Sequence, residues 1–88
     1  MDIEKIKQDI IGNLNNLKNV LPDTGFEDIN EYMEVGEYKL AMEVLCNMIF
    51  EYNILISKKN YMNIMGLCKN LCIDGKYWEP LKNNIKNT

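Results

Sequence analysis

The chain lacks histidine and arginine altogether, and Ser57 is its only serine. Nucleophilic catalysis needs a base beside the nucleophile, so a Ser-His or Cys-His mechanism is excluded. No glycine-rich phosphate loop and no metal or nucleotide motif is present either. Glu31 with Glu34, or Glu34 with Glu37, offers a carboxylate pair, but acidic clusters on protein surfaces are far more often solvated than catalytic. We therefore expect a protein that is not an enzyme and that binds no cofactor.

Cysteine is scarce, and the odd number of cysteines argues against a disulfide framework and indicates a reducing compartment. Cys68 and Cys72 are one helical turn apart, which is the spacing of neither a zinc knuckle nor a thioredoxin-type motif. No histidine is available to complete a metal site with them. We interpret Cys46, Cys68 and Cys72 as buried structural thiols and expect no metal.

Long apolar runs are absent too: no stretch of about 18 uncharged apolar residues could form a membrane span. The first residues, MDIEK, contain no basic leader followed by an apolar stretch, so no secretory signal is visible. The sequence therefore predicts a cytoplasmic protein without a membrane partner. Its 88 residues predict one domain, spanning residues 1–88.

The charge of the chain is distributed unevenly. Residues 23–51 hold eight carboxylates and one lysine, whereas residues 1–22 are balanced and residues 52–88 carry a charge of +4. The overall charge of −3 thus hides an acidic centre, an asymmetry that concerns partners more than fold. Because every base is a lysine and the net charge is negative, we expect no binding to nucleic acid.

Apolar residues recur at helical spacing throughout the chain, and no segment of strand length alternates with period two. The first helix is expected over residues 2–19, with the apolar stripe Ile3, Ile6, Ile10, Leu14 and Leu17. Gly12 lies inside this helix and predicts a close helix contact. The fold class is predicted to be all-α, as a compact bundle of four to five short helices.

The second helix is expected to begin with a capping box formed by Thr24 and Glu27, and to turn Phe26, Ile29 and Met33 inward. Gly36 is expected to end it in the left-handed conformation, and Glu37 to open the third helix. The third helix should be the centre of the core, with the inward positions Leu40, Ala41, Val44, Leu45, Met48, Ile49 and Tyr52.

The second half of the chain contains further start and stop signals. Asn53 is expected to end the third helix in the left-handed conformation, and Ser57 to cap a fourth helix that runs to about residues 74–75. Trp78, Leu81 and Ile85 indicate a last short helix that Pro80 opens after a separate turn. Residues 83–88 are expected to fray.

Glu27, Glu31 and Glu34 follow one another at helical spacing on the second helix, so their side chains share one face. The simplest interpretation is that this face only keeps the protein soluble. However, like charges four residues apart destabilise their own helix by about 0.2–0.5 kcal/mol per pair, a cost that interspersed lysines would avoid. Tyr32 and Tyr38 lie among the acids, and tyrosine is enriched at binding hot spots, although either could equally belong to the rim of the core.

Three stretches of the sequence resemble the MafI family of bacterial immunity proteins. They are VGEYKLAMEVL at residues 35–45, EYNILIS at 51–57, and LCID at 71–74 followed by Tyr77, Trp78 and Leu81. The shared pattern is a glycine-glutamate pair, a leucine-alanine step, a leucine-rich helix with a Tyr-Asn exit, and a serine-capped helix. The resemblance covers residues 20–86, and it depends on the order and spacing of these motifs.

Members of that family bind a secreted polymorphic toxin domain, such as those of contact-dependent growth inhibition systems, and so protect the bacterium. The resemblance implies a helical, cytosolic inhibitor without catalytic activity. Toxins of this kind are often nucleases, whose basic grooves an acidic face would complement. We expect the partner-binding residues to be Glu27, Glu31, Glu34, Glu37 and Tyr38.

The identity of the toxin, the choice between its active site and an adjacent exosite, and the oligomeric state stay open at this level. A second hypothesis is a small helical adaptor or regulatory domain without a toxin partner. Such an adaptor would use an apolar patch around Cys46, Phe50 and Ile54.

Overall fold

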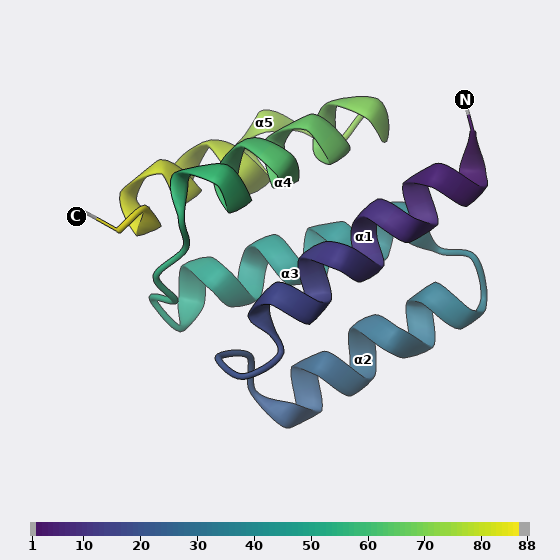
Figure 1. Cartoon of the computed structure of the whole chain (residues 1–88), viewed down its shortest axis with the longest axis horizontal. Helices are drawn as coiled ribbons and strands as arrows, with labels where there is room; N and C mark the ends of the chain where they lie inside the picture. The colour runs from purple at the N-terminus through teal and green to yellow at the C-terminus, as the bar shows by residue number, and fades with distance from the viewer. Residues whose placement is uncertain (1, 87–88) are drawn as a thin grey trace.

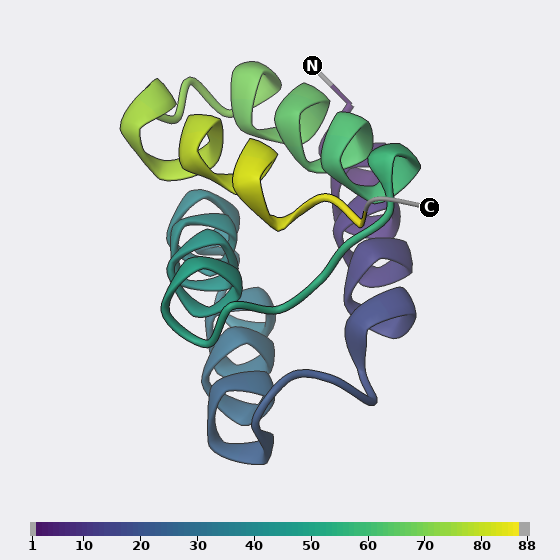
Figure 2. The ribbon, with the colours of Figure 1, turned by 90° about the vertical axis from the view of Figure 1, so that its left-hand side faces the viewer.

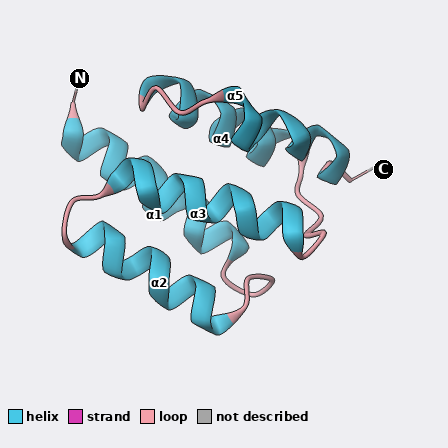
Figure 3. Cartoon of the chain, turned by 180° about the vertical axis from the view of Figure 1, so that it is seen from behind, coloured by secondary structure: helices cyan, strands magenta, loops and turns pink. Residues whose placement is uncertain are grey.

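The structure, a computed structural model, describes residues 2–86 and contains five α-helices and one 3₁₀ helix within them. These are α1 (Ile3–Leu17), α2 (Asp23–Glu34), α3 (Tyr38–Glu51), α4 (Lys58–Asn70), α5 (Gly75–Trp78) and η1 (Glu79–Asn84). Figure 3 shows helices joined by loops, and in the described residues the only β-type pairing is a single bridge between Ile56 and Ile85. The predicted all-α bundle of short helices is therefore confirmed.

The helices surround one apolar core in two groups. In Figure 1, α4 and the α5–η1 segment form the top of the molecule, α1 and α3 lie below them, and α2 forms the bottom. α2 packs most extensively on α3, while α3 also touches α5 and η1, and α1 touches α4. Figure 2 shows the same arrangement from the side, with α4 close to α1. α3 thus has neighbours on several sides, as expected for the centre of the core.

The burial of α1 and α3 differs in part from the prediction. Along α1 the predicted stripe is buried except for Ile3, which is the first helical residue and is 60% exposed. On α3, Met42 and Cys46 are fully buried, whereas Leu40 is exposed. The buried face is therefore wider than predicted, and it reaches α4 through Cys46, whose Sγ lies 3.8 Å from that of Cys68. Tyr52, the C-cap residue of α3, is also exposed, contrary to the prediction.

Three helices end in the same hydrogen-bonded turn, with one residue in the left-handed conformation after the helix. The residues with positive φ are Gly36 at 78°, Asn53 at 50° and Cys72 at 57°. In each turn the next amide donates to a carbonyl five residues earlier, as Ile73 N does to Cys68 O at 2.9 Å. This pattern is the Schellman motif, which satisfies carbonyls at the helix end. The predictions for Gly36 and Asn53 are confirmed.

Cys72 corrects the predicted end of the fourth helix. α4 stops at Asn70, before residues 74–75, because the left-handed Cys72 breaks the helix. Its start is as predicted, since Ser57 Oγ accepts a hydrogen bond from Asn60 N at 3.0 Å. Residues 75–78 form a separate short helix, and Pro80 lies in the first turn of η1, as predicted.

Two other local predictions are wrong. α2 begins at Asp23, directly after Pro22, and its N-cap makes no side-chain hydrogen bond, so Thr24 lies inside the helix and cannot cap it. At Gly12 an added Cβ would meet no heavy atom within 4 Å, so no close helix contact exists there. Gly25 on α2 is the glycine at a tight contact: a Cβ there would overlap Met48 of α3.

The C-terminal segment is anchored, which corrects the prediction that residues 83–88 fray; residues 87–88 lie outside the described residues. Asn84 is buried, and its Nδ2 donates to Ile49 O and Ile54 O, both at 3.0 Å. Its main chain accepts from Ile56 N at 2.9 Å, and Lys86 N donates to Ile56 O at 2.8 Å. The segment thereby ties the exit of α3 to the start of α4.

Candidate functional site

We call Glu27, Glu31, Glu34 and Glu37 the acidic face. The first three lie on α2, whose opposite side is packed on α3. The buried positions of α2 are Gly25, Ile29 and Met33, which are spaced four residues apart and so lie in one row. Because Gly25 has no side chain, Met48 of α3 reaches the backbone of α2 at this point. This row fixes the rotation of α2 about its own axis.

Glu27, Glu31 and Glu34 point away from the core. With 3.6 residues per turn, they lie about 140–160° around the helix from Ile29, and all three are exposed. At a rise of 1.5 Å per residue, the three carboxylates extend over about 10 Å of the helix. Asp23 and Asp28 on the same helix are also exposed. The fold therefore leaves the carboxylates on α2 free of any packing role.

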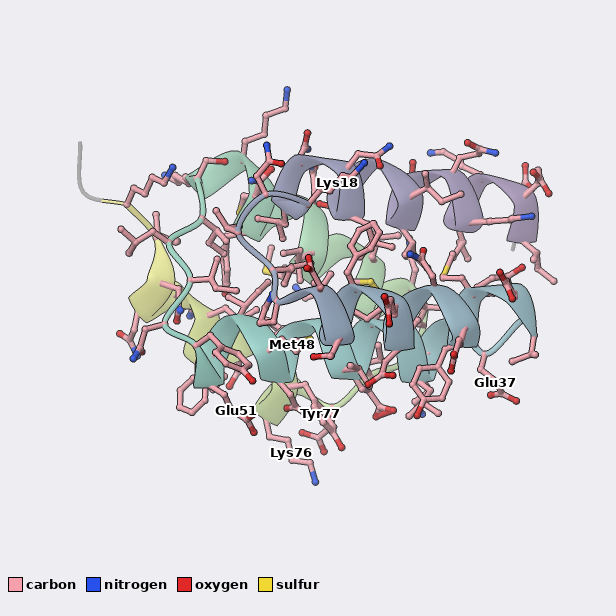
Figure 4. The ribbon with its side chains drawn as sticks, turned by 90° about the horizontal axis from the view of Figure 1, so that it is seen from below. Lys18, Glu37, Met48, Glu51, Lys76 and Tyr77 are labelled. Carbon is pink, nitrogen blue, oxygen red and sulfur yellow. The ribbon has the colours of Figure 1, made fainter. Side chains whose placement is uncertain are left out.

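Glu37 continues the acidic face across the turn between α2 and α3. It occupies the N-cap position of α3, but its side chain makes no capping hydrogen bond, and the residue is exposed. Its main chain is held by the bond from Glu37 N to Tyr32 O at 2.9 Å. Figure 4 views the molecule with α2 in front and shows Glu37 and Glu51 at opposite ends of α3.

Tyr38 differs from the four glutamates in that it is half-buried and packs against the core. Tyr32 has the same environment. Both tyrosines therefore contribute to the rim of the core, and only part of the Tyr38 ring is open to a partner. The structure thus brings four of the five predicted residues to the surface and places the fifth at the edge of that surface.

The lysines in the second half of the chain include two that lie over aromatic rings. Lys69 Nζ is 5.4 Å from the centre of the Trp78 ring, and Lys76 Nζ is 5.4 Å from that of Tyr77. Lys76 and Tyr77 are labelled together at the lower edge of Figure 4. Such cation–π contacts are worth about 0.5–1 kcal/mol at exposed sites.

The apolar patch of the adaptor hypothesis is not formed as predicted. Cys46 is fully buried and Ile54 is 6% exposed, so of the three residues only Phe50 is available, at 53% exposure. Two other large side chains near the end of α3, Tyr52 and Leu55, are each 59% exposed. The exposed apolar residues of this region are therefore Phe50, Tyr52 and Leu55.

The thiols are only partly as predicted. The Sγ atoms of Cys46 and Cys68 lie 3.8 Å apart between α3 and α4, and both residues are buried. The hydrogen bond with Cys68 raises the pKa of the Cys46 thiol above its ordinary value of 9.0, and burial raises it further. Cys72 is exposed, so its predicted burial is wrong.

Sequence reasoning missed a groove of about 540 Å³ between α1 and α4. Carboxamide side chains from both helices line it: Gln8, Asn13, Asn16, Asn63 and Asn70. Gly12 and Gly66 contribute open backbone, and Asp9 and Lys59 contribute one charge of each sign. A smaller hollow of about 250 Å³ shares Asp9 and Asn70 with it. The signal in the sequence was the recurrence of asparagine on the polar sides of both helices. We call this site the amide groove.

Within residues 2–86, no three metal-ligating side chains come close enough together to hold an ion. Across the same residues, none of the helices combines the length and the apolar character that a membrane crossing requires.

Comparison of the chain with protein-family models, with curated proteins and with solved structures finds no match. The resemblance to the MafI family is therefore carried by the sequence motifs alone.

Proposed function

We propose that this chain is an immunity protein that binds and neutralises the toxin domain of a secreted polymorphic toxin. In this proposal it acts in the cytoplasm, without catalytic activity, by covering the active site of the toxin or a surface beside it. A nuclease domain is the favoured target, because a basic substrate groove complements a row of carboxylates.

The observation that carries the proposal is the exposure of the acidic face. Glu27, Glu31 and Glu34 lie opposite the packed side of α2, so none of them is needed for the core. Glu37 caps nothing with its side chain, although it occupies an N-cap position. Like charges at this spacing oppose helix formation, and a charged partner offsets that repulsion. The motif resemblance supports the same class of partner.

Co-expression tests the proposal. The gene immediately upstream of this one is expected to encode a large secreted protein, and the carboxyl-terminal domain of that protein is the probe. In a bacterial host, that domain alone is expected to stop growth, and growth is expected to return when this chain is supplied. Growth that is the same with and without this chain contradicts the proposal.

A charge-reversal pair then tests the acidic face itself. The double variant Glu31→Lys/Glu34→Lys is expected to abolish protection. Glu4→Lys with Glu79→Lys is the matched control, because both residues are exposed and lie outside the acidic face. Each pair changes the net charge from −3 to +1, so the comparison isolates position from total charge. Equal protection by the two variants contradicts the proposed interface.

The second candidate function is a self-associating helical adaptor, and the exposure of Phe50, Tyr52 and Leu55 favours it. These three side chains lie within six residues of one another near the link between α3 and α4. Sedimentation of the chain alone distinguishes the two candidates. Association that rises with concentration and disappears in Phe50→Ser supports the adaptor, whereas a monomer at every concentration removes it.

A further inference from the structure

The core contains two thiols that touch each other. Cys46 of α3 and Cys68 of α4 are both fully buried, and their Sγ atoms lie 3.8 Å apart. At this distance two sulfur atoms are in contact, so no other side chain separates them. α3 packs mainly on α2, η1 and α5, and it makes few close main-chain approaches to α4. The thiol pair therefore joins two helices that share little other contact.

The surroundings of the pair favour one kind of chemistry. The hydrogen bond with Cys68, and burial after it, raise the pKa of the Cys46 thiol above 9.0, so this thiol is uncharged at neutral pH. A metal ion binds thiolates, and within residues 2–86 no third ligand completes a metal site. A disulfide carries no charge, so an apolar core holds it without burying an ion. The two sulfur atoms are therefore suited to oxidation to a disulfide.

The position of Cys68 provides a route for an oxidant. Cys68 lies in the last turn of α4, which ends at Asn70. Helix ends open locally at a much lower free energy than the centre of a core. Cys46 lies well inside α3, which runs from Tyr38 to Glu51, and has no such route. Local opening therefore exposes Cys68 first, and closing of the helix end returns it to Cys46.

We propose that Cys46 and Cys68 form a redox-sensitive lock, which closes to a disulfide between α3 and α4 when small-molecule disulfides such as glutathione disulfide become abundant. The exposed Cys68 thiol loses its proton and attacks the small disulfide, whose S–S bond breaks and releases one small thiol with that proton. When the helix end closes, Cys46 Sγ attacks Cys68 Sγ, and the second small thiol leaves with the Cys46 proton. Two protein thiols are thus oxidised and one small disulfide is reduced to two thiols.

The lock changes the stability of the chain in a measurable way. The two cysteines are 22 positions apart, and the ring that they close contains the end of α3, the link to α4 and most of α4. A disulfide across a loop of this length restricts the unfolded chain, so the midpoint of urea unfolding should rise by about 1 M or more. This inference goes beyond the proposed function, because it needs neither the acidic face nor a toxin.

The test uses the full-length chain with Cys72→Ser, because Cys72 is exposed and its thiol would form disulfides between molecules. The folded protein is incubated with excess glutathione disulfide, quenched in acid, unfolded and treated with N-ethylmaleimide. Mass spectrometry is expected to find a chain that has lost two hydrogen atoms and carries no label. Dithiothreitol should return it to the form with both thiols labelled, and the oxidised chain should have the higher midpoint in urea.

Two matched variants in the same Cys72→Ser background test the order of the steps. With Cys46→Ala the reaction should stop at a mixed disulfide of glutathione on Cys68, because no second thiol is present to displace it. With Cys68→Ala the remaining thiol lies inside α3, so it should acquire glutathione at least about tenfold more slowly. Equal rates in the two variants contradict the route through the end of α4.

Three other results would overturn the proposal. They are full labelling of both thiols after prolonged oxidation, a glutathione adduct that persists in the chain with both cysteines, and an oxidised chain with a lower midpoint in urea. No toxin domain is present in these measurements, so their failure leaves the proposed function untouched.

Discussion

Replacing Asn84 with alanine is expected to destabilise the whole fold, although Asn84 lies four residues from the end of the chain. The carboxamide donates to Ile49 O at the end of α3 and to Ile54 O in the link to α4. Ile49 O keeps a second donor, because Ile54 N bonds to it at 3.0 Å. Ile54 O has no other donor within the described residues, so the substitution leaves it buried and unpaired.

The magnitude follows from these contacts. Each lost hydrogen bond is worth about 1 kcal/mol, and an unpaired buried carbonyl costs a further 1–3 kcal/mol or so. We therefore expect Asn84→Ala to lower the free energy of unfolding by about 3–5 kcal/mol. A loss of this size is a large part of the roughly 5–15 kcal/mol that small domains possess, and it lowers Tm by about 10 °C or more.

Urea unfolding followed by far-ultraviolet circular dichroism measures the effect. Asn83→Ala is the matched control, because Asn83 is the adjacent asparagine of η1 and is exposed. It should stay within about 0.5 kcal/mol of the wild type. If Asn84→Ala also stays within that range, the hydrogen bonds of Asn84 do not anchor the segment and the reasoning is wrong.

Gly25→Ala should lower the free energy of unfolding in urea by about 1–3 kcal/mol, because the added methyl group overlaps Met48. The loss should be smaller in a Met48→Ala background, and an equal loss in both backgrounds contradicts the contact. Burial and, to a lesser degree, the Glu79 charge raise the pKa of Tyr61 above 10.0. The folded state therefore keeps the Tyr61 proton to a higher pH than the unfolded state does. The free energy of unfolding should then fall as the pH rises above about 10, and Tyr61→Phe should make this fall less steep. Under native conditions a maleimide should label Cys72 and spare buried Cys46, and equal labelling rates contradict their placement.

Local chemistry predicted the helices and most of their ends. Gly36 and Asn53 adopt positive φ more easily than other residues, and Ser57 has a side chain suited to an N-cap, so each boundary was predictable from one residue. Cys72 has no such preference. Its left-handed conformation is stabilised by the hydrogen bonds of the turn and by burial of Ile73, which a local pattern does not reveal.

Contacts between distant elements were less predictable. The apolar pattern of α3 predicted one inward stripe, but α3 also faces α4 through Cys46 and Cys68, so its buried face is wider. The anchoring role of Asn84 depends on carbonyls 30 and 35 residues away in sequence. Periodicity identifies which side of a helix is apolar, and it leaves open which helix covers that side.

In the candidate site too, features set by local sequence were predictable and features set by helix packing were not. The common face of Glu27, Glu31 and Glu34 was predictable because helical spacing determines it, and their exposure followed once Ile29 and Met33 were buried. The half-burial of Tyr38 depends on how α3 packs, and the amide groove depends on the pairing of α1 with α4. The sequence showed asparagines at helical spacing in α1 and in α4, but it did not show that these two helices lie side by side.

The central claim is that the acidic face docks on a basic toxin surface, and the association rate tests it most directly. The rate is measured by stopped-flow mixing with the toxin domain over a range of salt concentrations. The double variant Glu31→Lys/Glu34→Lys is compared with the control double variant Glu4→Lys/Glu79→Lys. At low salt the first pair should reduce the rate at least about tenfold and flatten its salt dependence, while the control should stay close to the wild type. An unchanged rate with an unchanged salt slope in the first pair would contradict the account.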